Sequence, residues 1–72
     1  MSNRALTMHE IWLEGKYLMT VEYLRLKANL YAFHNEFVEV YYNDDTECVE
    51  KIQQASDEDL KKYLSQIHSY LF

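Results

Sequence analysis

The chain has 72 residues, a net charge of −5, one cysteine, one glycine and no proline. This length allows one small domain, residues 1–72, and the negative charge argues against direct binding of nucleic acid or of an anionic membrane surface. The single cysteine excludes an internal disulfide, and no stretch approaches the roughly 18 apolar residues of a membrane helix, so we expect a cytoplasmic protein.

The first elements are predicted between residues 7 and 26. Thr7 and Glu10 have the spacing of a capping box at the start of a helix, and Gly15 is suited to end that helix. Residues 17–23 then alternate between apolar and polar, which is typical of a strand. Helical spacing also fits part of this segment, which leaves a longer helix open. We predict a short helix followed by a strand.

Residues 28–53 are predicted to form an antiparallel meander. β-branched and aromatic residues are frequent in 30–33, in 36–42 and in 47–52, and short polar segments separate these three strands. The second connection is acidic and has the composition of a tight turn. These residues therefore predict a hairpin at the centre of a small sheet.

Two registers of this hairpin are compatible with its pattern. The favoured one places Val40 opposite Val49 and, as a consequence, Glu39 opposite Glu50. The alternative pairs Glu39 with Lys51, but it requires a left-handed conformation at the β-branched turn residue Thr46, which is unfavourable. The choice matters because a shift of one residue exchanges the two faces of a strand.

A C-terminal helix is predicted to begin after Ser56, which can cap it together with Asp59. Lys62 is expected to lie off its apolar stripe, which should pack on one face of the hairpin. We therefore predict an α+β fold: an antiparallel β-meander of three to four strands, a C-terminal amphipathic helix packed on one face, and a short N-terminal helix. The stripe consists of Leu60, Tyr63, Leu64, Ile67 and Leu71.

The sequence predicts no catalytic, cofactor or metal site. The three histidines, His9, His34 and His68, fall in separate segments, whereas a metal site requires convergent ligands. Cys48 has acidic neighbours and no expected helix N-terminus beside it, which makes it a poor nucleophile. Glu39 opposite Glu50 could act as an acid and base pair only if both were buried. We expect a protein that is not an enzyme.

Negative charge is concentrated in the middle of the chain, where residues 36–59 contain nine acidic residues and one basic residue. We predict a non-enzymatic protein-interaction or dimerisation module, with a second copy and a different protein as equally expected partners. One alternative is an acidic inhibitor or antitoxin-like mimic that occupies a basic site. Another is a small-ligand or enzymatic role at a dimer cleft. The candidate partner-binding residues are Glu39, Tyr41, Asp44, Asp45, Glu47 and Glu50.

Overall fold

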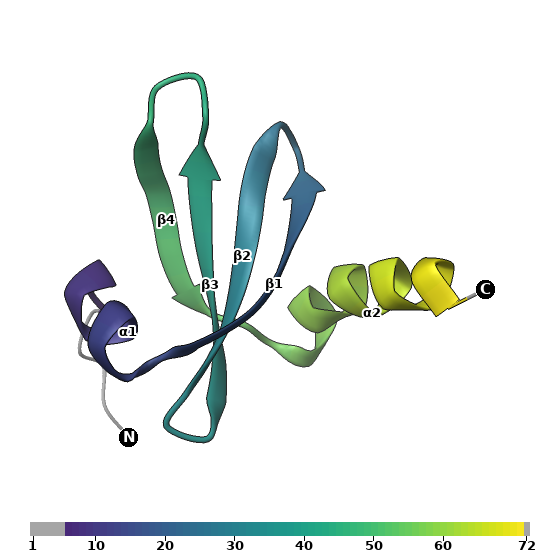
Figure 1. The fold of residues 1–72 in the computed structure, drawn as a ribbon, viewed down its shortest axis with the longest axis horizontal. Coiled ribbons are helices and arrows are strands. Elements are labelled where there is room, and N and C mark those ends of the chain that lie inside the picture. The colour runs from purple at the N-terminus through teal and green to yellow at the C-terminus, as the bar shows by residue number, and fades with distance from the viewer. Residues whose placement is uncertain (1–5, 72) are drawn as a thin grey trace.

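The computed structural model describes residues 6–71, which form a four-stranded antiparallel sheet with a helix on each face (Figure 1). The strands are adjacent in chain order, so the sheet is a meander. This confirms the predicted α+β class, including a short helix and then a strand at the N-terminal end. The elements are α1 (Met8–Glu14), β1 (Lys16–Tyr23), β2 (Leu26–Phe33), β3 (Glu36–Asn43), β4 (Cys48–Gln54) and α2 (Asp57–Leu71).

Helix α1 begins and ends at the predicted residues. Thr7 and Glu10 form the capping box, with the Glu10 amide donating to Thr7 Oγ1 at 3.2 Å. Gly15 ends the helix in an extended conformation, φ −87°, and its amide donates to Ile11 O at 2.7 Å. A Cβ at position 15 would lie 2.5 Å from that oxygen. Glycine is therefore favoured here by the close approach of two backbone segments, not by a left-handed φ.

Two-residue turns connect the first three strands. Leu24 and Arg25 join β1 to β2 with φ of 52° and 69°, and His34 and Asn35 join β2 to β3 with φ of 50° and 65°. Positive φ at both central residues matches the right-handed twist of the flanking strands, and Asn is well suited to it. Leu24 and Arg25 adopt the same conformation without a side chain that favours it.

The register of the β3–β4 hairpin differs from both predictions. Val40 lies opposite Ile52, and Glu39 lies opposite Gln53 rather than Glu50 or Lys51. The difference has two causes, one in the connection and one in the first residues of β4.

The connection is a four-residue turn in which Glu47, not Thr46, has a left-handed φ of 59°. It is closed by the Glu47 amide, which donates to Asn43 O at 2.7 Å. The register then shifts between the pairs of Tyr41 and Tyr42, which leaves Glu50 unpaired in β4 as in a β-bulge. Both predicted registers require a shorter turn and an uninterrupted ladder, and they therefore place the β4 residues too early.

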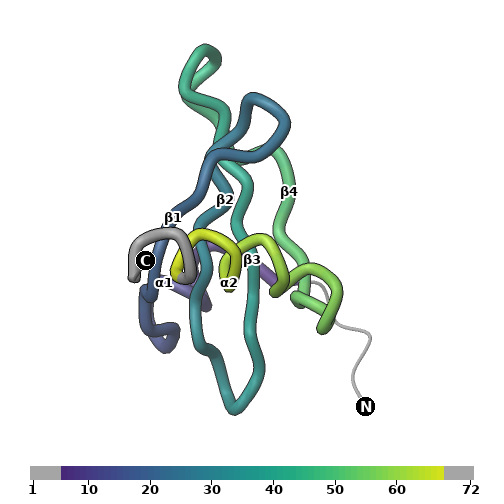
Figure 2. The backbone as a smooth tube through the Cα atoms, turned by 90° about the vertical axis from the view of Figure 1, so that its right-hand side faces the viewer, coloured from purple at the N-terminus to yellow at the C-terminus, as the bar shows by residue number. Residues whose placement is uncertain are grey.

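Each face of the sheet has a core of buried apolar side chains. Helix α1 contributes Ile11 to the core on one face, and α2 contributes Tyr63 to the core on the other. Figure 2 shows α2 crossing in front of the strands, with α1 behind them. The buried residues of the α1 face are Ile11, Phe33, Val38 and Val40, and those of the α2 face are Val21, Ala28, Leu30, Tyr41, Ala55 and Tyr63.

Helix α2 packs on the sheet over only part of its apolar stripe. Ser56 and Asp59 form the predicted cap, with the Asp59 amide donating to Ser56 Oγ at 3.2 Å. Tyr63 is 2% exposed, but Leu64 is 61% and Ile67 42% exposed. The end of α2 points away from the sheet in Figure 1. The expectation that the whole stripe packs on the sheet is thus wrong for these two residues; the side chains of His68 and Leu71 lie outside the described part.

Candidate functional site

The most unusual side chain of the sheet is Glu39, a carboxylate that is completely buried. It lies in β3 on the face covered by α2, between Leu30 of β2 and Gln53 of β4. Gln53 Nε2 donates to Glu39 Oε1 at 2.8 Å, and the hydroxyl of Tyr41 donates to Glu39 Oε2 at 3.1 Å. Glu39 is therefore not accessible to a partner, as the predicted partner-binding role would require, because α2 covers it.

Helix α2 supplies the two strongest partners of this carboxylate. Tyr63 Oη donates to Glu39 Oε2 at 2.7 Å, and Lys62 Nζ lies 2.6 Å from the same oxygen. The Lys62 side chain is 15% exposed and points inward. The prediction that Lys62 lies off the buried side of α2 is therefore wrong. A buried charge is tolerated when it is paired and hydrogen-bonded, and Glu39 meets both conditions.

Three tyrosine rings surround the Lys62 ammonium. Its Nζ lies 5.0 Å from the ring centroid of Tyr23, 5.7 Å from that of Tyr41 and 5.1 Å from that of Tyr63. These distances are within the range of cation–π attraction. Lys62 Nζ also donates to Asp59 O at 2.9 Å. The cluster therefore holds α2 against the sheet through charge, aromatic faces and hydrogen bonds.

The electrostatics of the pair favour its charged form. Burial raises the pKa of Glu39, but hydrogen bonds from Lys62, Gln53 and Tyr63 and the charge of Lys62 outweigh burial, so the pKa lies below 4.5. Burial lowers the pKa of Lys62, whereas Glu39 raises it above 10.5. Burial and the neighbouring carboxylate also raise the pKa of the Tyr63 hydroxyl. A general acid at neutral pH needs a raised carboxyl pKa, and Glu39 has the opposite.

The predicted partner-binding residues are divided between the interior and the surface. Tyr41, like Glu39, is buried, at 6% exposure, and cannot serve as an exposed anchor. Asp44, Asp45, Glu47 and Glu50 are exposed, as expected.

Part of the charge on this acidic turn is already paired within the chain. Lys27 Nζ lies 3.1 Å from Asp44 Oδ2 and pairs its charge, whereas Glu50 Oε2 accepts a hydrogen bond from the neutral amide of Asn43, Nδ2, at 3.1 Å. The negative surface available to a partner is accordingly smaller than the sequence indicates.

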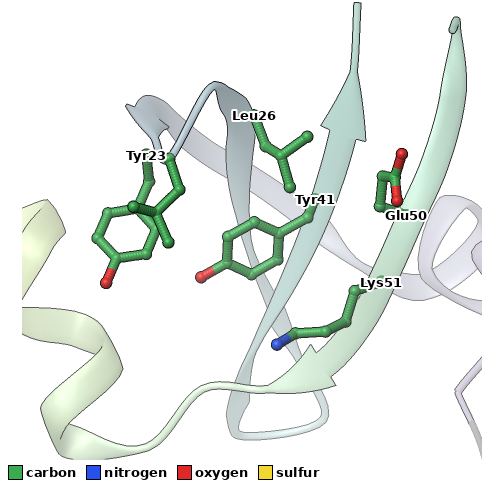
Figure 3. Close-up of a pocket in the computed structure, with 6 residues that line it drawn as sticks. Tyr23, Leu26, Tyr41, Glu50 and Lys51 are labelled. Atoms are coloured by element: carbon green, nitrogen blue, oxygen red, sulfur yellow. The ribbon is translucent and has the colours of Figure 1, made fainter.

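A shallow hollow of about 270 Å³ lies beside Tyr41, between the β1–β2 turn and β4. Figure 3 shows the rings of Tyr23 and Tyr41 near Leu26, while Glu50 and Lys51 point apart. Lys51 Nζ lies 5.4 Å from the centroid of the Tyr41 ring. The hollow is smaller than the roughly 300–1,000 Å³ of most small-molecule sites. Glu50 and Lys51 do not converge on a common point within it.

A larger groove of about 430 Å³ opens between α2 and the sheet. Leu18 of β1 is 42% exposed and Phe37 of β3 is 41% exposed, and they face the exposed Leu64 and Ile67 of α2. This apolar groove was not predicted. The sequence contained one signal of it, a helical stripe that continues past Tyr63, but could not show that the sheet leaves this part uncovered. The lining residues are Leu18, Met19, Leu30, Phe37, Leu60, Tyr63, Leu64 and Ile67.

Comparisons with protein-family models, with curated proteins and with solved structures found no significant match. Among residues 6–71, no helix is long and apolar enough to cross a membrane. The same residues contain no cluster of three or more His, Cys, Asp or Glu side chains that could hold a metal ion. The main feature of the candidate functional site is the apolar groove beside the Glu39–Lys62 pair.

Proposed function

We propose that this protein is a non-enzymatic interaction module that binds an amphipathic helix in the groove between α2 and the sheet. One observation carries the proposal: large apolar side chains on α2 and on two strands face one another and remain exposed. Contiguous exposed apolar surface of this kind marks interaction sites more often than isolated apolar residues do.

The shape of the groove favours a protein segment as its occupant. One wall is the helical surface of Leu64 and Ile67, and the other is the sheet at Leu18 and Phe37. An amphipathic helix that inserts its apolar stripe between two such walls is a recurrent mode of peptide recognition. All eight lining residues are uncharged, so the partner's contact face should also be apolar.

The acidic-mimic alternative is less well supported. It depends on a dense negative surface, yet Glu39 is buried and Asp44 is paired with Lys27. Asp45 and Glu47 remain exposed on the β3–β4 turn. Isolated exposed carboxylates at a turn are common solvated surface. The enzymatic alternative also loses its proposed pair, because Glu39 faces Gln53 and not Glu50.

The proposal can be tested by titrating the ¹⁵N-labelled full-length chain with a synthetic neutral amphipathic helix of leucine, glutamine and alanine. We expect saturable amide shifts at Leu18, Phe37 and Leu64, and little change around Ile11 on the opposite face. Leu64→Glu should abolish the shifts, and Gln66→Glu, which adds the same charge at an exposed position, should preserve them. Absence of shifts in the groove, at a protein concentration where the chain is monomeric, would refute the proposal.

A further inference from the structure

We propose that the occupant of this groove is helix α2 of a second copy of the chain, so that two copies form a two-fold symmetric dimer. This inference rests on the proposed function, because it requires that the groove bind a helix. It adds the identity of the partner and a symmetric geometry, in which each α2 lies against the groove of the other copy.

The groove and α2 are complementary to each other. Leu64 and Ile67 form one wall of the groove and are also the exposed part of the α2 stripe. The same surface therefore presents both a cavity and an apolar helix that can enter one. A two-fold axis places such a patch against itself, which is the arrangement of an isologous dimer. A dimer would bury Leu64 and Ile67 together with Leu18 and Phe37 in a single contact.

The charge distribution permits this pairing despite the net charge of −5. The sequence contains no Asp or Glu after Asp59, so most of α2 carries no carboxylate. The exposed carboxylates of the β3–β4 turn lie at one tip of the sheet, away from α2 (Figure 1). Two α2 helices can therefore meet without bringing acidic side chains together, and repulsion between carboxylates does not oppose the dimer.

The exposed area predicts a weak and reversible dimer. Four side chains contribute most of it: Leu64 is 61% exposed, and Leu18, Ile67 and Phe37 are 42%, 42% and 41% exposed. With their neighbours these side chains offer on the order of 400 Å² per copy, about half of the ~800 Å² per partner in a standard interface. Self-association should consequently depend on concentration across the micromolar range.

Sedimentation equilibrium of the full-length chain, from micromolar to millimolar concentration, tests the inference. Leu64→Glu alters the helical wall and Leu18→Glu alters the sheet wall, and each should raise the dimer dissociation constant by about tenfold or more. Gln66→Glu adds the same charge to an exposed position of α2 and should change that constant by less than about twofold. Circular dichroism of each variant verifies that the fold is retained.

The possible outcomes separate this inference from the proposed function. A dimer weakened by both wall variants supports the inference. A monomer at every concentration overturns it, and so does a dimer that either wall variant leaves unweakened. Binding of the neutral amphipathic peptide to a monomeric chain would preserve the proposed function while excluding a second copy as partner. Absence of both peptide binding and self-association would overturn both proposals.

Discussion

Lys62 Nζ of α2 lies 2.6 Å from Glu39 Oε2 of β3, and the Glu39 side chain is completely shielded from solvent. This ion pair joins the last helix to the middle of the sheet. It also fixes the position of α2, because Tyr63, one residue later, donates to the same carboxylate oxygen. The groove exists beside this contact: α2 is held at Lys62 and Tyr63, whereas Leu64 and Ile67 extend beyond it.

Glu39→Gln should destabilise the fold by about 2–4 kcal/mol, because it leaves the Lys62 ammonium largely buried without a counter-charge. Urea denaturation measures the loss as a lower transition midpoint. Glu58→Gln removes an exposed partner of Lys61, 3.1 Å away, and should change stability by less than about 1 kcal/mol. Equal effects of the two substitutions would show that the buried pair contributes no more than a surface pair.

Stability should fall on the acidic side because the pKa of Glu39 is below its ordinary 4.5 in the folded protein. The unfolded chain binds this proton more readily, so the contribution of Glu39 is complete above about pH 4.5 and is lost as the pH falls further. Urea denaturation across the acidic range gives the slope. The slope should be smaller in Glu39→Gln, and an unchanged slope would assign the acid sensitivity to other carboxylates.

On the alkaline side, stability should decrease above about pH 10. The pKa of Lys62 is raised above 10.5 and that of the Tyr63 hydroxyl is raised above 10.0, so the folded state favours the protonated form of both groups. Their contributions are complete below the unfolded-state pKa values and are lost at higher pH. Tyr63→Phe should reduce the alkaline slope when unfolding is followed by circular dichroism. If the slope is unchanged, the Tyr63 hydroxyl does not contribute to it.

Gly15→Ala should destabilise the fold by about 1–3 kcal/mol, although φ at this position suits any residue. The new Cβ would lie 2.5 Å from Ile11 O, so α1 or the start of β1 must move. Thermal unfolding measures the effect. Leu13→Ala, at a nearby site that is 63% exposed, should be close to neutral. A neutral Gly15→Ala would mean that the backbone yields without loss of packing.

The double substitution Leu24→Asn with Arg25→Gly should stabilise the protein by about 1–2 kcal/mol, because both residues have positive φ, which Asn and Gly adopt more readily. Leu24 is 77% exposed, so little packing is lost. The matched control, Leu24→Ala with Arg25→Ala, removes the same side chains without favouring this conformation and should give no gain. Guanidinium denaturation compares the two. A gain in the control as well would point to the side chains rather than the backbone.

Local sequence patterns predicted the elements and their order, although helical spacing left a longer helix open between residues 7 and 26. Both helix starts follow from local capping pairs, Thr7 with Glu10 and Ser56 with Asp59, and the strands follow from alternation, since these signals act over a few residues of chain. The tertiary structure decided the hairpin register, because a left-handed Glu47 and the extra residue Glu50 are not visible in a pattern of period two.

Long-range packing also determines which charged side chains lie on the surface and which lie in the interior. Glu39 and Lys62 are distant in sequence and polar, and each by itself favours solvent; they are buried because they meet across the sheet and helix and satisfy one another. The exposure of Leu64 and Ile67 on the α2 stripe also depends on how the helix packs on the sheet. A periodic stripe shows that a helix can be covered, but the extent of the sheet beneath it determines how much is covered within one copy of the chain.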